Sequence, residues 1–143
     1  MILIDCTYKS NRYRLPLVDI VGVSCHGTSF FIAHAFIREE DEDTFRWVVR
    51  RLLEALGFQP NAFVVDLQLA LINALKSLSH SRVLVCRWHI NKNVLAHYVS
   101  LSTGSVSEER RNNIMAMWAD VYNARTENDF VMSTTRGRRT TLW

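Results

Sequence analysis

The sequence predicts an α/β fold, a mixed five-stranded sheet with helices, from three observations. Three short apolar runs come first, separated by polar or glycine-containing segments, as in antiparallel hairpins. Two further apolar runs then alternate with helical periodicity, and this alternation implies parallel strands joined by right-handed crossovers. The expected order is therefore β-β-β-α-β-α-β-α, followed by the start of a helical insertion that we expect to be incomplete.

Length and composition favour one globular domain over a disordered or membrane-spanning chain. The 143 residues are 48% hydrophobic and 22% charged. No apolar run reaches the roughly 18 residues of a membrane helix, and residues 1–5 lack the basic start of a signal peptide. Three scattered cysteines do not form a disulfide framework. The net charge of +3 permits contact with nucleic acid without requiring it.

The first three strands are predicted at residues 2–4, 15–23 and 30–37. The first ends at, or just past, Asp5 and is followed by a polar turn. A turn with Gly27 separates the second strand from the third. These short connections predict antiparallel pairing of the three strands.

The first helix is predicted by an acidic run at residues 39–43 followed by apolar residues at helical spacing. Those residues are Phe45, Val48, Val49, Leu52, Leu53 and Leu56. Negative charge suits the start of a helix, and Gly57 stands where a C-cap glycine belongs. We interpret the acidic run as a solvated helix start rather than a metal site.

Strands and helices then alternate along the chain. Strands are expected at residues 62–65 and 82–85, and helices follow at 67–78 and 90–98. The fourth strand ends on Asp66 and the fifth at Cys86. This order matches the RNase H-like architecture.

The last third of the sequence predicts helices and then an irregular end. Ser105 and Glu108 fit a capping box before a helix at 114–121. Thr126 and Asp129 predict a further helix cap. The apolar pattern stops at Met132. We therefore divide the chain into an RNase H-like core at 1–98, a helical insertion segment at 99–131 and an irregular tail at 132–143.

Two carboxylates at strand ends are the main chemical signal. In an RNase H-like sheet, the strands ending on Asp5 and Asp66 are parallel neighbours, about 4.8 Å apart. Ligands bind at the carboxyl edge of such sheets, and Mg²⁺ prefers oxygen ligands. Two ions can clamp the oxygens of a phosphoryl transfer, but the site normally needs a third carboxylate. Taken singly, each aspartate is better explained as a turn former or helix cap than as a catalytic residue.

Three sequence blocks resemble the transposase domain of Mutator-like elements, the MULE domain. They are Ile4-Asp-Cys-Thr-Tyr-Lys-Ser-Asn-Arg-Tyr-Arg-Leu-Pro-Leu17, Val64-Val-Asp-Leu-Gln-Leu-Ala-Leu-Ile-Asn-Ala-Leu75 and Cys86-Arg-Trp-His-Ile-Asn-Lys-Asn-Val94. The resemblance covers roughly residues 2–130 and implies an RNase H-like core with a DDE triad.

The resemblance also implies site residues, cofactor and partner. Asp5 matches the first catalytic acid and Asp66 the second. Both would bind Mg²⁺ or Mn²⁺ and activate water, and then a DNA 3′-hydroxyl, for strand cleavage and joining. The implied partner is DNA at transposon ends, and the implied location is the nucleus.

The sequence departs from the family at three places. The family's third acid, a glutamate, lies beyond a helical insertion that follows the Cys-x-x-His block, and we find no matching motif after His89. Leu67 stands where the family usually has a basic residue. Met1 lies only four residues before Asp5. We therefore expect a chain clipped at both ends and inactive alone, because losing one ligand removes positioning and charge stabilisation together.

Cys86 and His89 offer two metal-type ligands at tight spacing. Structural zinc needs four ligands, and no second pair stands at usable spacing. By resemblance, the pair is an auxiliary motif near the active site. The alternative is that Cys86 is a small buried residue ending a strand and that His89 sits at a helix start.

Basic residues near the carboxylates are candidate DNA contacts. Lys9, Arg12 and Arg14 interleave with tyrosines next to Asp5, a pattern suited to a DNA backbone or an unpaired base. A positively charged hairpin edge that opposes aggregation explains them equally well.

Other side chains give weaker signals. Arg87 and Lys92, near the carboxyl edge, are further candidate DNA contacts. We interpret Trp47, Trp88 and Trp118 as packing residues rather than base stackers.

Three functions fit these patterns. The first is a fragment of a Mutator-like DNA transposase catalytic domain. The second is a non-catalytic, transposon-derived module that binds DNA or protein. The third is another two-metal nuclease of the same fold, with its third acid in the last helices.

Overall fold

The computed structural model describes residues 1–7, 11–102 and 104–140, and for 136–140 we describe the backbone alone. The strands are β1 (Ile2–Thr7), β2 (Leu17–Val23), β3 (Ser29–Phe36), β4 (Ala62–Val65) and β5 (Arg82–Val85). The helices are α1 (Glu42–Leu56), α2 (Leu69–Leu78), α3 (Arg87–Leu101), α4 (Glu108–Asn123) and α5 (Glu127–Thr140). The chain divides into two compact units, Met1–Ile90 and Asn91–Trp143.

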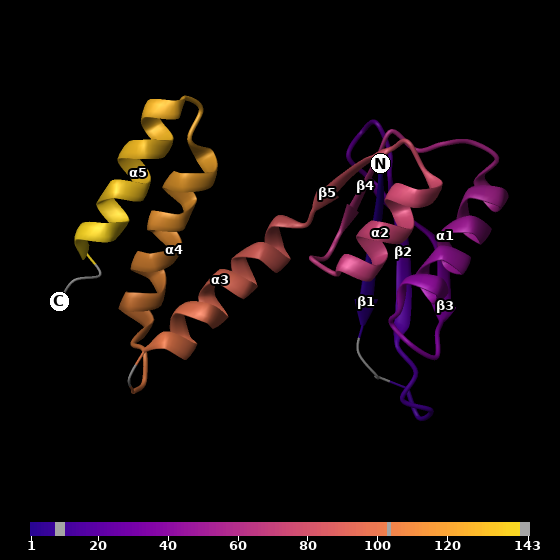
Figure 1. Cartoon of the computed structure of the whole chain (residues 1–143), viewed down its shortest axis with the longest axis horizontal. Coiled ribbons are helices and arrows are strands. Elements are labelled where there is room, and N and C mark those ends of the chain that lie inside the picture. The colour runs from indigo at the N-terminus through magenta and orange to yellow at the C-terminus, as the bar shows by residue number, and fades with distance from the viewer. Residues whose placement is uncertain (8–10, 103, 141–143) are drawn as a thin grey trace. The chain divides into compact units, whose positions relative to one another are not determined.

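The first unit contains a five-stranded sheet in the order β3-β2-β1-β4-β5 (Figure 1). β1 pairs antiparallel with β2, and β2 with β3. β1 pairs parallel with β4, and β4 with β5. The prediction of a mixed, RNase H-like sheet, with the first and fourth strands as parallel neighbours, is confirmed.

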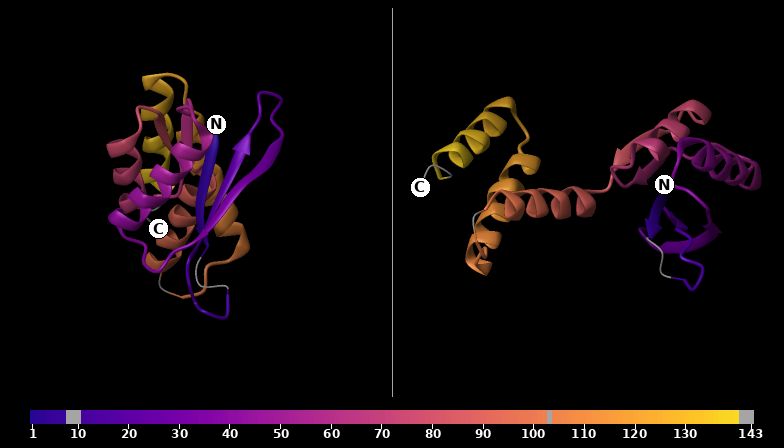
Figure 2. Two further views of the ribbon diagram at one scale, coloured as in Figure 1. Left: turned by 90° about the vertical axis from the view of Figure 1, so that its right-hand side faces the viewer. Right: turned by 60° about the horizontal axis from the view of Figure 1, so that its bottom comes forward.

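The core lies between one face of this sheet and the helices α1 and α2 (Figure 2). Alternate residues of the central strands are buried there, among them Ile4, Ile20 and Phe63. Because side chains alternate along a strand, the residues between them point to the opposite face. We call that opposite face the open face, since neither α1 nor α2 covers it.

Local signals fix the ends of α1. The Asp41 carboxylate accepts a hydrogen bond from the Thr44 backbone N–H at 2.7 Å. Gly57 adopts φ 68° and donates its N–H to the Leu53 carbonyl at 3.1 Å. A left-handed residue at this position favours glycine, so the predicted helix end is confirmed.

Of the two helix caps predicted in the second unit, one differs in the structure and one is confirmed. The residue that caps α4 is Ser107, not Ser105, because the Ser107 hydroxyl accepts the Arg110 N–H at 3.3 Å. The predicted cap formed by Thr126 and Asp129 is confirmed by two reciprocal hydrogen bonds, at 3.1 and 3.2 Å.

The segment predicted as an irregular tail from 132 is helical as far as Thr140. Hydroxyl groups in the middle of α5 donate to carbonyls in the preceding turn, for example Thr135 to Val131 at 2.7 Å. The apolar periodicity used for the prediction stops at Met132, so it did not reveal the rest of this helix. Within the described ranges, no helix is both long and apolar enough to cross a membrane.

Candidate functional site

Asp5 and Asp66 lie side by side where the pairing of β1 with β4 ends, although β1 itself continues past Asp5 to Thr7. Ile4 pairs with Val65 across these strands, and each aspartate is the next residue along the chain. Asp5 Oδ1 accepts the Cys6 N–H at 3.0 Å, and Asp66 Oδ1 accepts the Leu67 N–H at 2.5 Å. Their side chains are 51% and 41% exposed, so both carboxylates are open to solvent.

The imidazole of His89 lies between the two carboxylates. Its Nε2 is 3.5 Å from Asp5 Oδ1, and its Nδ1 is 3.8 Å from Asp66 Oδ1. The His89 side chain is only 16% exposed, and its buried Nδ1 has no hydrogen-bond partner among the described residues. Both distances are longer than those of ordinary hydrogen bonds.

The Cys-x-x-His spacing places this ring at the site. Cys86 follows β5 and donates its N–H to the Val65 carbonyl of β4 at 2.7 Å. The Cys86 carbonyl then accepts the Ile90 N–H, so α3 begins at once and its first turn carries His89 to the carboxylates. The auxiliary role of Cys86 and His89 stays a prediction, but His89 shares the site with both acids.

The arrangement presents two exposed carboxylates to a divalent cation. Mg²⁺ and Mn²⁺ favour carboxylate oxygens and keep several bound waters, as two exposed carboxylates allow. Within the described ranges, no group of three or more His, Cys, Asp or Glu side chains could hold a metal ion. Asp5 and Asp66 are the side chains that would hold an ion at this edge.

A hollow of about 270 Å³ adjoins the carboxylates on the open face. It is lined by Leu3, Ile4, Asp5, Val64, Asp66, Cys86, Trp88 and His89. Trp88 is 62% exposed, and its ring meets that of His89 edge-on, with centroids 4.7 Å apart.

The three tryptophans interpreted as packing residues differ in their surroundings. Neither Trp88, which lies on the surface of the hollow, nor Trp47, on α1, is buried in the core. Trp118 is half-buried in the second unit, where its ring meets that of Tyr122 edge-on and its Nε1 donates to Asn91 Oδ1 at 2.9 Å.

Arg12 and Arg14 are exposed on the loop that follows β1. Asn11 shapes this loop, because its side-chain oxygen accepts the N–H groups of Tyr13 and Leu15. The Arg12 guanidinium lies 4.5 Å from the centre of the Tyr13 ring. The turn brings Arg14 to φ 55° and leaves both arginines in solvent near the carboxyl end of β1.

The other predicted DNA contacts are placed differently. Lys9 lies outside the described residues. Arg87 is exposed at the first position of α3, two residues before His89. Lys92 lies in the next turn of α3, within the second compact unit. A role in DNA contact stays a prediction for all five basic residues.

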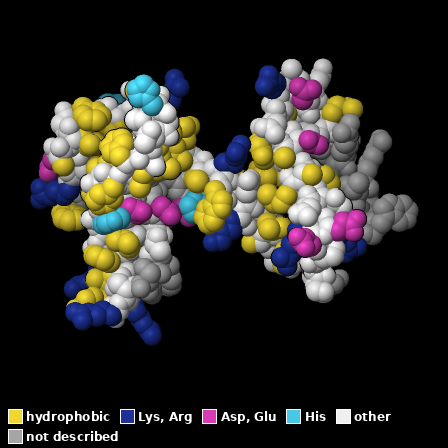
Figure 3. Space-filling model, turned by 180° about the vertical axis from the view of Figure 1, so that it is seen from behind, with side chains coloured by type: hydrophobic (Ala, Val, Ile, Leu, Met, Phe, Trp, Pro, Cys, Tyr) yellow, Lys and Arg dark blue, Asp and Glu magenta, His cyan; other side chains and the backbone are white. Residues whose placement is uncertain are grey.

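Sequence reasoning missed two polar residues on the open face. Asp19 lies directly opposite Asp5 across β1 and β2, and His34 lies opposite Asp19 across β2 and β3. His34 Nδ1 is 3.0 Å from Asp19 Oδ1. Figure 3 shows acidic and histidine side chains gathered in a row on this face, with hydrophobic side chains beside them. The sequence signal that could have identified them is a single titratable residue within a largely apolar strand, Asp19 in β2 and His34 in β3.

Glu40, in the loop before α1, contacts the segment that follows Asp66. Its Oε2 accepts a hydrogen bond from Gln68 Nε2 at 2.7 Å, two residues after Asp66. Burial, followed by the charge and hydrogen bond of Glu40 and the charge of Asp5, raises the pKa of the Cys6 thiol to about 12. Cys6 therefore remains protonated at neutral pH.

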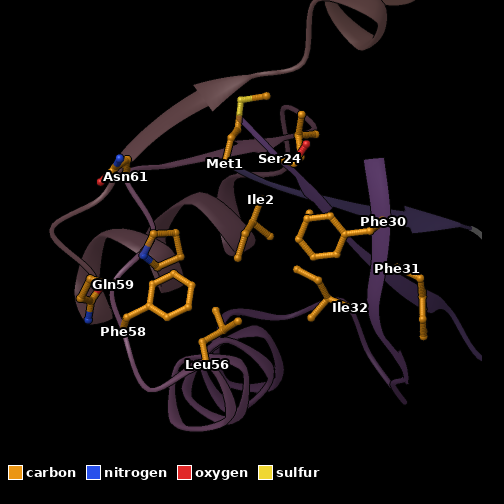
Figure 4. Close-up of a pocket in the computed structure, with 13 residues that line it drawn as sticks. Met1, Ile2, Ser24, Phe30, Phe31, Ile32, Leu56, Phe58, Gln59 and Asn61 are labelled. Carbon is orange, nitrogen blue, oxygen red and sulfur yellow. The ribbon is translucent and has the colours of Figure 1, made fainter. Parts of the chain in front are cut away.

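A larger apolar cavity of about 680 Å³ lies around the amino end of β1 (Figure 4). Phe30, Leu56 and Phe58 line it together with Met1 and Ile2. None of the candidate site residues lines it.

Comparisons with known proteins agree with this geometry. The profile of the MULE transposase domain matches residues 1–93. The chain is 37% identical over 92 residues to Protein FAR1-RELATED SEQUENCE 5 of Arabidopsis thaliana, covering 62% of this chain and 11% of that protein. It is 27% identical over 136 residues to Protein FAR1-RELATED SEQUENCE 2 of the same plant, covering 92% of this chain and 17% of that protein.

One similar solved structure is the catalytic core domain of BIV integrase. The TM-score is 0.44 at 10% sequence identity, and the match covers 98% of this chain and 97% of that one. The family profile matches well over half of the chain and includes both aspartates and His89. This chain belongs to the MULE transposase domain family.

Proposed function

We propose that this domain is a transposase-derived module that binds DNA without cutting it. The observation that carries the proposal is the composition of the carboxyl edge. Asp5 and Asp66 face one imidazole, and no cluster of three metal-ligating side chains occurs in the described part of the chain. Cleavage by two metal ions clamps the attacking and leaving oxygens together, which two exposed carboxylates do not achieve.

The exposed arginines support DNA as the partner. Arg12 and Arg14 project from the loop at the carboxyl end of β1, and Arg87 begins α3 close to His89. These side chains offer positive charge to a phosphate backbone. One divalent cation shared by Asp5 and Asp66 would offset the repulsion between carboxylate and phosphate. Membership in the family makes the nucleus the proposed location.

The first test measures DNA binding and cleavage by the purified chain. Fluorescence anisotropy with labelled duplex DNA, over a salt series, should give binding that weakens as salt rises. Arg12→Ala and Arg14→Ala should each weaken binding and lower the salt slope by about 1. Arg82→Ala is the matched control, because Arg82 is an exposed arginine at the opposite end of β5.

The same preparation is then incubated with supercoiled plasmid and Mg²⁺ or Mn²⁺. We expect no nicking. Absence of salt-sensitive DNA binding would contradict the proposal. Nicking that requires Mn²⁺ and disappears in Asp5→Asn would instead establish a catalytic domain.

A second test addresses the cation. Electron paramagnetic resonance of added Mn²⁺ should reveal one weakly bound ion in the wild type and a loss of that binding in Asp5→Asn and Asp66→Asn. Asp43→Asn, an exposed change on α1, should bind Mn²⁺ as the wild type does. Equal binding by the wild type and both site variants would refute a shared cation site.

A further inference from the structure

We infer that Trp88 stacks on an unpaired base of a DNA strand whose phosphate lies at Asp5 and Asp66. The inference rests on the proposed DNA binding and adds its substrate class, a strand with an unstacked nucleotide. It begins with the juxtaposition of an exposed indole and two carboxylates around one hollow.

The position of Trp88 is not that of a packing residue. Its side chain is 62% exposed, although burying an aromatic ring is normally favourable. The neighbouring residue in α3, His89, is largely buried between the carboxylates. Because His89 is held there, the adjacent indole is held at the rim of the same hollow.

The chemistry of the hollow suits a nucleotide. One side carries the carboxylates of Asp5 and Asp66, where a hydrated cation can bridge to a phosphate. The other parts are apolar, including Leu3 and Val64, and the indole stands beside them. A base offers a flat apolar face at a short distance from its own phosphate, so a single nucleotide can use both parts.

The base must be unpaired to make this contact. In a duplex the faces of the bases are covered by their neighbours, and enzymes that engage one base remove it from the stack. Aromatic stacking is a common way of holding single-stranded nucleic acid and tolerates any base. The site should therefore prefer a duplex with a single-stranded overhang to a blunt duplex of the same sequence.

The test compares these two DNAs with the full chain in the presence of Mn²⁺. We expect the wild type to bind the duplex with the overhang more tightly than the blunt duplex. Trp88→Ala should lose affinity about tenfold for the overhang duplex and keep its affinity for the blunt duplex. Trp88→Phe should keep most of the preference, since it keeps an aromatic face. Trp47→Ala is the control, because Trp47 is another exposed tryptophan, on α1.

Fluorescence supplies an independent readout. Overhang DNA should quench tryptophan emission in the wild type, and the quenching should be absent in Trp88→Phe, which retains the other three tryptophans. Because this readout compares the wild type with Trp88→Phe, it remains valid even if Trp88→Ala does not fold.

Each outcome has a distinct meaning. The role of Trp88 is overturned if the wild type binds overhang and blunt DNA equally well, or if Trp88→Ala keeps the preference for the overhang. If DNA binding is still sensitive to salt in that case, the proposed function stands. If an apolar peptide binds the wild type but not Trp88→Ala, and does not displace DNA, Trp88 belongs to a protein-binding site instead. If neither DNA binds, the proposed function fails as well.

Discussion

His89 lies between the two carboxylates of the site. Its ring nitrogens lie 3.5 and 3.8 Å from oxygens of Asp5 and Asp66. A divalent ion bound to both oxygens at about 2.1 Å would need part of the space that the ring fills. An ion bound there would therefore compete with the imidazole for the gap between the carboxylates.

Replacing His89 by alanine should strengthen Mn²⁺ binding several-fold, because both carboxylates then face an open space and repel each other. Isothermal titration calorimetry with Mn²⁺ would measure the change. His97→Ala is a histidine control in the second unit. A loss of Mn²⁺ affinity in His89→Ala would identify the imidazole as a ligand rather than a competitor.

Cys6 should react slowly with iodoacetamide at pH 8.5, because its pKa of about 12 leaves few thiolates. Its reactivity should rise only as the pH approaches 12. Mass spectrometry would compare its rate with that of Cys25, which is exposed. Glu40→Gln should accelerate the reaction in part, since burial is the largest cause of the raised pKa. Equal rates for Cys6 and Cys25 in the folded protein would show that the thiol is not protected.

The helix α1 shows how local capping shapes an element. Hydrogen bonding from the Thr44 backbone lowers the pKa of Asp41. The charged carboxylate caps the helix best, so its stabilising effect is complete above the ordinary aspartate pKa and is lost as the pH falls through the lowered one. At the other end, Gly57 holds a left-handed conformation.

Asp41→Ala should lower the urea midpoint at pH 7, and the difference from wild type should shrink as the pH falls through the lowered pKa. Urea denaturation followed by circular dichroism over a pH series would measure both midpoints. Asp43→Ala is the neighbouring control, since Asp43 makes an exposed ion pair with Arg46. A difference that does not vary with pH would rule out the charged cap.

In the molecule as a whole, the first unit holds the carboxylates through its buried core. Phe63 in β4 is fully buried and packs in this core three residues before Asp66. The carboxyl edge is therefore only as rigid as the packing between the sheet and its two helices. Loss of that packing would separate Asp5 from Asp66, because they belong to different strands.

Phe63→Ala should lower the free energy of unfolding by about 3–5 kcal/mol, since a core cavity adds to the loss of apolar burial. That is a large share of the stability of a typical domain. Urea denaturation would measure it, with Phe58→Ala as the control because Phe58 is largely exposed. A cost below about 1 kcal/mol for Phe63→Ala would contradict the described core.

Features encoded by neighbouring residues could be predicted from the sequence. Helical spacing gave α1, and Gly57 gave its end. Short connections predicted the first three strands as antiparallel. The order of the elements matched the RNase H-like architecture, in which the fourth strand lies beside the first. The proximity of Asp5 and Asp66 followed from that topology.

Contacts between distant segments were decided only by the tertiary structure. The register of β1 and β2 puts Asp19 opposite Asp5, and the β-bulge between Ile20 and Val21 belongs to the pairing rather than to either strand. The early start of α3 places His89 between the acids and leaves Trp88 at the surface. Periodicity reports which side of an element is apolar. It does not report which partner that side meets, because strand register and helix packing depend on residues far away in the chain.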